Sequence, residues 1–455
     1  MKALSPSDAM FLLAELRRQP MHVAGLQLFT LPKGAPPTFI GDMVEQMRSF
    51  DKPMPPYNMR PVLRGTWFWQ EDADFDIDHH LRHLSLPQPG RIRELLAMVS
   101  RLHGSLMDRS RPLWETSLIE GLHDGRMAIY SKVHHAMFDG VSATMEARKS
   151  LTEDASKRDM PPPWARPKST RIPSDSALGQ PASPLNALLQ SLSANYRVIP
   201  GAARGFYDLL RRGSKDPADI TPYQAPPTML NVRISSSRRF AAQSYSLARI
   251  KAVSKKSGAT LNDIALAMCA GALREYLISH QALPDKPLIT MVPVSVRAAD
   301  GPEGGNQVSV ILASLGTHIA DPSRRLAAII ASTKKAKERM AQMTRVEQLA
   351  YAAAALSPMA LTTQLGLDRF RPAFNVVISN VPGPKNPLYW NGAKLDETYP
   401  LSIPIDGQAL NITLTSYCDQ IAFGYTACRR SVPSMQRLLD YTERSLAELE
   451  SVVAG

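Results

Sequence analysis

The chain has 455 residues, of which 44% are hydrophobic and 21% are charged, a balance that is ordinary for a folded globular protein. Its length predicts two domains of roughly 150–230 residues each, because a single hydrophobic core rarely grows larger. The excess of Lys and Arg gives a net charge of +12, which suits nucleic acid, an anionic lipid surface or a phosphate-bearing molecule. No helix-turn-helix, zinc-finger or RNP-like pattern accompanies the charge, so we expect no nucleic acid partner.

The cysteines and the apolar runs indicate the compartment in which the protein is expected to work. Three cysteines, Cys269, Cys418 and Cys428, form no CxxC pair, which predicts no disulfide framework, no zinc site and a reducing compartment. The apolar run at residues 11–14 is flanked by charges and is too short for a signal peptide. No run approaches the length of a transmembrane span, so we expect any membrane contact to be peripheral.

The N-terminal half is predicted to mix helices with strands. Residues 5–18 form an amphipathic pattern with Ser5 or Ser7 as N-cap. Further along, apolar periodicity predicts a strand at 23–31, a helix at 91–108, and a hairpin of 115–120 with 127–133 that turns at 123–125. The stretch from Asp76 to His80, with His83, is rich in possible metal ligands but lacks HExxH or His-x-x-x-His spacing, so we expect no metal there.

The residues His134-His135-Ala136-Met137-Phe138-Asp139-Gly140 stand between an apolar run and a helical pattern. The run at 126–133 predicts a mostly buried strand, and Ser142 is the expected N-cap of the following helix. Adjacent side chains on a strand point to opposite faces. One histidine can therefore face a cleft while the scaffold holds the other.

This arrangement suits proton abstraction. Histidine titrates near neutral pH and can take a proton from an alcohol or a thiol during nucleophilic attack. Asp139 can fix the turn, and Gly140 leaves room beside it. The alternative is an ordinary turn, because Asp-Gly is a common turn dipeptide. We favour the functional interpretation because the whole pattern, directly after a strand, should rarely arise by chance.

Residues 154–227 form a predicted linker, since twelve of the 37 prolines fall between Pro161 and Pro227. Within it, residues 185–212 combine apolar and arginine side chains in a basic amphipathic segment. Such a segment suits a membrane or lipid-droplet surface. A crossover helix packed on the second domain explains the same pattern equally well.

The second half, residues 228–455, again mixes both kinds of element. We predict strands at 232–235, 238–247, 288–296, 374–379, 405–415 and 420–426, and helices at 248–257, 262–279, 321–343, 345–365 and 432–453. Gly258 closes the first of these helices, and Thr260 caps the second. Both halves lack regular βαβ repetition, which favours an α/β fold of the α+β kind.

Three features of this half bear on a site. Asn262 and Asp263 begin a helix, where capping alone is the alternative to a role at a cleft. Arg297 is a charge placed directly after an apolar strand. The stripe of Leu349, Ala353, Leu356 and Ala360 has helical spacing and small residues, which suit either a narrow apolar slot or an ordinary core.

Several common chemistries lack their sequence signatures. The chain has no GxGxxG or Walker pattern, which argues against a nucleotide cofactor and a kinase. It has no GxSxG, so a serine hydrolase route through an acyl-enzyme lacks its nucleophile elbow. Direct transfer with one histidine of the pair as the base is the simplest chemistry left.

The pattern His-His-x-x-x-Asp-Gly after a strand resembles the signature of the acyl-CoA-dependent acyltransferase superfamily, which includes chloramphenicol acetyltransferase and peptide-synthetase condensation domains. Four further stretches are similar to the bacterial wax ester synthase/diacylglycerol acyltransferase (WS/DGAT) family: Leu4–Leu12, Pro112–Glu115, Leu261–Ile264 and Ser379–Pro384. The resemblance covers nearly the whole chain apart from the linker.

The resemblance implies two chloramphenicol-acetyltransferase-like sandwich domains with mixed sheets, at 1–153 and 228–455. The linker at 154–227 joins them, and a tunnel lies at their interface. It implies O-acyl transfer from fatty acyl-CoA to a long-chain alcohol or diacylglycerol, giving wax esters and triacylglycerol. Acyl-CoA is a substrate and no cofactor is expected. The place of work would be cytoplasmic, peripheral on the inner face of the membrane or on lipid inclusions.

The resemblance also implies roles for particular residues. His135 is the base and His134 is structural, although strand alternation leaves open which histidine faces the cleft. Asp139 orients the loop and pairs with Arg297. The other expected site residues are Gly140, the substrate-binding or oxyanion candidates Asn262, Ser379 and Asn380, and the acyl-slot candidates Leu356 and Ala360. Two alternatives remain: a condensation-type acyltransferase with another donor, and a non-catalytic lipid-surface-binding protein.

Overall fold

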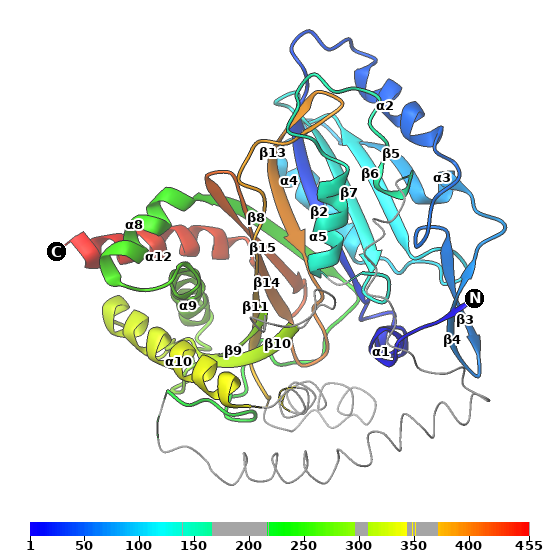
Figure 1. The fold of residues 1–455 in the computed structure, drawn as a ribbon. Helices are drawn as coiled ribbons and strands as arrows, with labels where there is room; N and C mark the ends of the chain where they lie inside the picture. Colours follow the sequence, from blue (N-terminus) through cyan, green and yellow to red (C-terminus); the bar gives the residue numbers. More distant parts are fainter. Residues whose placement is uncertain are drawn as a thin grey trace.

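The computed structural model describes residues 1–138, 140–165, 216, 218–295, 308–343, 348, 351 and 372–454. Two six-stranded mixed sheets form its frame and lie next to each other (Figure 1). The first runs in the order β12-β13-β2-β7-β6-β5. Its strands are β2 (His22–Thr30), β5 (Leu81–Ser85), β6 (Trp114–Glu120), β7 (Met127–His134), β12 (Tyr389–Trp390) and β13 (Ala393–Leu401).

The second sheet runs in the order β10-β9-β11-β14-β15-β8. Its strands are β8 (Arg238–Ser246), β9 (Ile289–Ser295), β10 (Val308–Ser314), β11 (Val376–Val381), β14 (Leu410–Tyr417) and β15 (Gln420–Cys428). Four helices lie along one side of this sheet in Figure 1: α8 (Leu247–Ser257), α9 (Leu261–Ser279), α10 (Pro322–Gln342) and α12 (Arg437–Ala454). The largest buried cluster lies between these helices and the sheet, with α9 buried along most of its length.

The remaining elements belong to the N-terminal half. A small three-stranded sheet, β1 (Lys2–Ala3), β4 (Thr66–Glu71) and β3 (Met59–Arg64), stands beside the first large sheet. The helices are α1 (Pro6–Ala14), α2 (Phe39–Arg48), α3 (Ile77–His80), α4 (Ile92–His103), α5 (Gly140–Lys149) and the 3-10 turn η1 (Pro163–Ala165). α4 packs between the two large sheets, where Leu95 and Val99 join a cluster with Phe240 and Leu401.

The C-terminal half completes the first sheet. β13 pairs antiparallel with β2, with Leu395 opposite Phe29 and Tyr399 opposite Leu26. The expected domain ranges of 1–153, 154–227 and 228–455 stay a prediction. These ranges assign residues 389–401 to the second half, whereas the structure adds them to the first sheet as a crossover of β12 and β13. Because the crossover strand is hydrogen-bonded into the first sheet, it ties the second half to the edge of β2.

Polar contacts just after α1 also link the halves. Arg18 Nε lies 2.8 Å from Asp406 Oδ2, and Gln19 Oε1 accepts the backbone N–H of Asp406 at 2.8 Å. Arg238 donates from Nη2 to the carbonyl of Arg18 at 2.7 Å. Asp406 and Arg238 are buried, so these charges stay in place only because each has a partner.

The local signals in the sequence predicted most elements well. Ser5 caps α1, Thr260 caps α9 with the Asp263 carboxylate closing a capping box, and Gly258 ends α8 with a φ of 69°. The hairpin of β6 and β7 is confirmed, with Gly125 at a φ of 75° in its turn.

Several local predictions were wrong, including one end each of the elements expected at 91–108, 405–415 and 432–453, where the structure has α4 ending at His103, β14 beginning at Leu410 and α12 beginning at Arg437. Residues 232–235 form no strand, because their backbone does not pair with a neighbouring strand. The N–H of Ile234 donates instead to the side-chain oxygen Oδ1 of Asp406, at 2.9 Å. α5 begins at Gly140, so Ser142 lies within it rather than at its N-cap. α1 ends at Ala14 rather than residue 18, because Glu15 adopts an extended conformation and the chain turns back.

Several predictions fall on residues that the structure does not describe. These are the roles of Asp139, Arg297, Leu356 and Ala360, the basic segment at 185–212, and nearly all of the helix at 345–365. Within the described ranges, no helix is long and apolar enough to cross a membrane.

Candidate active site

The end of β7 carries the two histidines. The N–H of His134 donates to the carbonyl of Leu113 at 2.9 Å, and the N–H of His135 donates to the carbonyl of Met21 at 2.8 Å. The turn after the strand is held from inside, because His134 Nδ1 accepts the N–H of Ala136 at 3.1 Å. A neutral ring that accepts at Nδ1 carries its hydrogen on Nε2. The His134 side chain is therefore part of the turn that presents His135.

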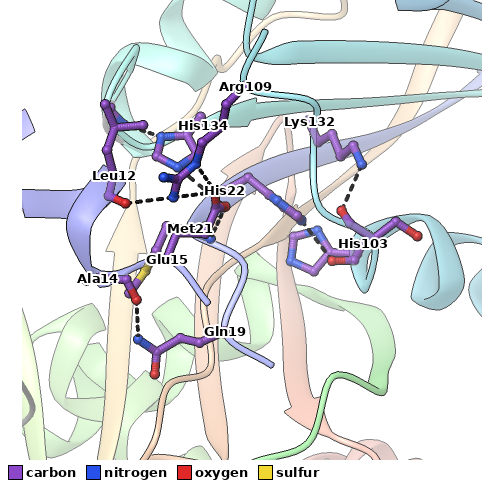
Figure 2. A network of polar contacts seen from close by, with 12 residues as sticks. Leu12, Ala14, Glu15, Gln19, Met21, His22, His103, Arg109, Lys132 and His134 are labelled. Carbon is purple, nitrogen blue, oxygen red and sulfur yellow. Dashed lines mark hydrogen bonds and ion pairs between the residues drawn. The ribbon is translucent and has the colours of Figure 1, made fainter. Parts of the chain in front are cut away.

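His134 is fully buried and faces a buried carboxylate. Its Nε2 lies 3.4 Å from Glu15 Oε1, a close contact that is longer than a well-formed hydrogen bond. Glu15 Oε1 also accepts the N–H of Met21 at 3.1 Å. Arg109 donates to Glu15 Oε2 at 3.0 Å and to the carbonyl of Leu12 at 2.6 Å, and Figure 2 shows it between these two acceptors. One guanidinium thus fixes the end of α1 and the carboxylate beside the motif.

The charge state of Glu15 follows from these contacts. Burial by itself raises the pKa of a carboxyl, since it penalises the charged form. The His134 ring, the N–H of Met21 and the Arg109 guanidinium outweigh burial and hold the pKa of Glu15 below its ordinary value of 4.5. Glu15 is therefore a carboxylate at neutral pH. It follows α1 directly and holds the ring of His134 in place.

His135 has a different environment from its neighbour. Its side chain is half-buried on the turn, and its ring stacks on Phe11 of α1, with ring centroids 4.0 Å apart and an interplanar angle of 18°. Stacking limits the rotation of the imidazole without burying it completely. The pair therefore consists of one locked histidine and one that is partly exposed and oriented by an aromatic ring.

A second group of buried polar residues lies next to the motif. His22 faces His134 across β2 and β7, and its Nε2 donates to the carbonyl of His103 at 2.8 Å. His103 accepts from the Tyr130 hydroxyl at 2.9 Å and donates from Nε2 to the carbonyl of Ser402 at 2.9 Å. Because Ser402 follows β13, this histidine ties α4 to the crossover from the other half.

Lys132 lies two residues before His134 and is also buried. Its Nζ donates to the carbonyls of Leu102 and Ser105 at the end of α4 and lies 3.3 Å from Glu115 Oε2. Burial lowers the pKa of Lys132, and Glu115 partly restores it. A cation at the C-terminal end of a helix is favourable because the last carbonyls are otherwise unpaired.

Buried histidines should make the fold sensitive to acid. Burial lowers the pKa of His103 to about 3 and of His80 to about 4, and lowers that of His22 well below its ordinary 6.5. Below pH 6.5 the unfolded chain binds protons that the folded chain does not, so stability is present above that pH and is lost as pH falls. Each such histidine changes the free energy of unfolding by about 1.4 kcal/mol per pH unit.

We expect urea titrations to show a free energy of unfolding lower by a few kcal/mol at pH 5 than at pH 7. In His103→Gln the free energy of unfolding should depend less steeply on pH. An unchanged slope in that variant would contradict this.

The stretch that suggested a metal site is a buried aromatic stack. His80 donates from Nδ1 to the carbonyl of Trp114 at 2.7 Å, and its ring stacks on both Phe75 and Trp114, which also stack on each other. Among the described residues, no group of three or more His, Cys, Asp or Glu could hold a metal ion. His80 is thus a core histidine.

The other predicted site residues lie on the second half. Asn262 is half-buried in the first turn of α9, while its neighbour Asp263 closes the capping box of that helix and accepts from Thr333 of α10 at 2.7 Å. Ser379 and Asn380 are half-buried near the end of β11. Gly140 begins α5 on the N-terminal half. Among the described residues, the structure therefore brings His134 and His135 together with Glu15, and places Gly140, Asn262 and the pair Ser379 and Asn380 on three other elements.

The wax ester synthase/diacylglycerol acyltransferase catalytic-domain model matches residues 4–265, and the WS/DGAT C-terminal-domain model matches residues 304–450. The chain belongs to the WS/DGAT family. It is 46% identical to the O-acyltransferase WSD of Acinetobacter baylyi, covering all of this chain and 98% of that protein. It is 47% identical to a putative diacylglycerol O-acyltransferase of Mycobacterium tuberculosis, covering 99% of this chain and all of the relative.

Solved structures agree with the family match. A WS/DGAT from Marinobacter aquaeolei VT8 superposes with a TM-score of 0.82 at 44% identity, and the match covers the full length of both chains. The first condensation domain of the calcium-dependent antibiotic synthetase matches with a TM-score of 0.58 at 15% identity, which concerns the fold alone. The predictions of the family, of the mixed-sheet α/β fold and of an O-acyltransferase are therefore confirmed.

One WS/DGAT stretch that the sequence singled out has a clear structural reason. In Ser379-Asn-Val-Pro-Gly-Pro384, the N–H of Gly383 donates to the Ser416 hydroxyl at 3.0 Å, and a Cβ at Gly383 would collide with the Ser416 carbonyl. The glycine thus lets the turn after β11 lie against β14, which a residue with a side chain could not do without moving the backbone.

Gly383→Ala is therefore expected to lower the free energy of unfolding by about 1–3 kcal/mol, because the clash is with backbone. Gly41→Ala is the matched control, since Gly41 lies within α2 with nothing within 4 Å of an added Cβ. That change should stabilise by up to ~1 kcal/mol. Equal effects of the two substitutions in urea titrations would contradict the close approach at Gly383.

Proposed function

We propose that this protein transfers a fatty acyl group from acyl-CoA to the hydroxyl of a long-chain alcohol or of diacylglycerol. The observation that carries the proposal is the unequal environment of the histidine pair, with His134 locked against Glu15 and His135 half-buried on the turn. A general base must reach the proton that it removes, and His135 is the more accessible of the two. The names wax ester synthase and diacylglycerol O-acyltransferase, carried by the relatives, support these acceptor classes.

The chemistry needs one base and no redox step. His135 takes the proton of the acceptor hydroxyl, and the oxygen attacks the carbonyl carbon of the thioester. The C–S bond of the tetrahedral intermediate then breaks, and protonated His135 returns its proton to the departing sulfur of CoA. One ester and one free thiol result. Acyl-CoA already carries the activated carbonyl, so this scheme uses no cofactor.

We assign supporting roles to the other residues as part of the same proposal. His134 holds the turn, Asp139 orients it and pairs with Arg297, and Gly140 leaves room for the reacting groups. The substrate lies in a tunnel between the two halves. The remaining candidates are Asn262, Ser379 and Asn380 as contacts to the substrate or to the oxyanion, and Leu356 and Ala360 as lining of an acyl slot.

We further propose that the protein works as a peripheral protein on the cytoplasmic face of the membrane or on lipid inclusions. Long-chain alcohols and diacylglycerol partition out of water, so an enzyme that uses them gains from contact with the phase that holds them. The net charge of +12 supports attraction to anionic lipid.

The test is release of the CoA thiol from palmitoyl-CoA with hexadecanol or a diacylglycerol as acceptor. We expect release that depends on the acceptor, together with formation of the ester. Release only from an acyl group on a carrier protein would favour a condensation-type acyltransferase. No release with any donor or acceptor, with vesicle binding retained, would favour a lipid-binding protein without catalysis.

A further inference from the structure

The outer face of α1 exposes apolar side chains to solvent. Met10 and Leu13 are 59% and 64% exposed, and Leu16 just after the helix is 36% exposed. Met10 and Leu13 lie three apart in α1 and therefore share one face of the helix, and Leu16 follows in the turn after it. We call Met10, Leu13, Leu16 and the exposed Arg17 the α1 ridge.

The inner face of the same helix lies against the histidine pair. Leu12 is buried with Ala136 of the motif turn, Phe11 stacks on His135, and the carbonyl of Leu12 accepts from Arg109. One helix therefore separates the exposed ridge from the motif. Since an α-helix with its side chains is about 10–12 Å across, His135 lies within roughly that distance of whatever covers the ridge.

The charges around the ridge favour an anionic partner. Leu16 and Gln19 form a tight turn with backbone hydrogen bonds in both directions, and Arg17 is exposed within it. Between Pro6 and Arg18 the acidic residues are Asp8 and Glu15. Asp8 lies in the first turn of α1, at the opposite end of the helix from Arg17, and Glu15 is buried and paired with Arg109. An exposed apolar ridge that ends in a cation suits the interface of a lipid layer, where apolar side chains enter the acyl region and cations meet phosphate.

We propose that the α1 ridge is the surface by which this protein docks on an anionic phospholipid layer, with His135 one helix away from that layer. This deepens the lipid-surface part of the proposed function and rests on it for its purpose, but the docking itself requires no acyl transfer. Contact at this face brings the motif next to the phase that holds long-chain acceptors.

The test is sedimentation of the full chain with vesicles of equal parts phosphatidylcholine and phosphatidylglycerol. We expect the parent protein to bind them and to bind phosphatidylcholine vesicles more weakly. The double variant Met10→Ser/Leu13→Ser should bind about tenfold more weakly, because two apolar side chains no longer leave water. Arg17→Gln should bind about fivefold more weakly and lose part of its salt dependence.

The matched control is Ile92→Ser/Ile278→Ser. These side chains are 39% and 49% exposed and lie in the first turn of α4 and the last turn of α9. We expect the control to bind as the parent does, with all variants unfolding at similar temperatures. Parent-like binding by the α1 variant, equal loss in the control, or no vesicle binding by the parent would overturn the proposal. So would a change of oligomeric state in the α1 variant with unchanged vesicle binding, because the ridge would then hold a second copy.

A second readout separates this proposal from the proposed function. With hexanoyl-CoA and hexanol, both dissolved in water, the α1 variant should release CoA thiol as fast as the parent. With hexadecanol in vesicles, its rate should fall in line with its binding. If the parent releases no thiol with either pair, the proposed function fails while the sedimentation result still decides the docking surface.

Discussion

Replacement of His135 by alanine is expected to lower the rate of acyl transfer by about 10²–10⁴-fold, the usual contribution of a positioned general base. The backbone of the turn should persist, because it is held by the His134 ring, which accepts the Ala136 N–H, and by the bond from the His135 N–H to Met21. The loss should therefore appear in kcat with a smaller change in KM. CoA thiol release at saturating palmitoyl-CoA measures it.

A matched control distinguishes the loss of a base from a general effect of removing a histidine. His123 lies exposed in the turn between β6 and β7, so His123→Ala should keep both its activity and its unfolding temperature. His135→Ala should unfold within a few degrees of the parent, because the side chain is only half-buried. Full activity in His135→Ala would remove this residue from the proposed chemistry.

The features that the sequence predicted well depend on neighbours along the chain. The hairpin of β6 and β7 follows from two apolar runs joined by a short turn at Gly125. The start of α9 follows from Thr260 and Asp263, whose side chains bond each other's backbone N–H groups. Strand alternation also predicted that the two motif histidines lie in different surroundings, although it left open which one is locked.

The features that the sequence missed depend on contacts between distant segments. The pairing of β13 with β2 joins Leu395 to Phe29, and the periodicity of either strand does not specify its partner. Glu15 is a similar case, since its partners Arg109 and His134 come from other elements. The available signal was an acidic residue directly after the short apolar run of α1, which is an unusual place for an unpaired charge.

Glu15→Ala is expected to lower the free energy of unfolding by about 1–3 kcal/mol, because it removes a buried carboxylate and leaves the half-buried Arg109 charge without its acceptor. The N–H of Met21 also loses its acceptor. Glu15→Gln keeps an acceptor for that N–H and should cost less. Both variants should also lower kcat, since the ring of His134 would no longer face a fixed anion and the turn that carries His135 would loosen.

The exposed pair of Glu45 and Arg48 is the control for this prediction. Its atoms are 2.6 Å apart, closer than the 3.0 Å between Glu15 and Arg109, and the two arginines are similarly exposed, but the Glu45 side chain is 70% exposed where that of Glu15 is 4% exposed. Glu45→Ala should therefore cost at most ~1 kcal/mol. Burial decides the difference, because water screens the exposed pair and compensates when one partner is lost. An equal decrease in the free energy of unfolding in Glu15→Ala and Glu45→Ala would show that burial of Glu15 adds nothing to the stability of the fold.

A comparison of the parent with Glu15→Gln at different pH values isolates the contribution of the carboxylate charge to stability. The folded-state pKa of Glu15 lies below 4.5, so its stabilisation is present above that pH and is lost as pH falls through the folded-state pKa. The buried histidines lower the stability of both the parent and Glu15→Gln in acid, and their contribution cancels in the difference. The difference in the free energy of unfolding between the two proteins should be constant above pH 5 and should become smaller below pH 4.5. A gap that stays constant into acid would mean that the charge of Glu15 contributes nothing to holding His134.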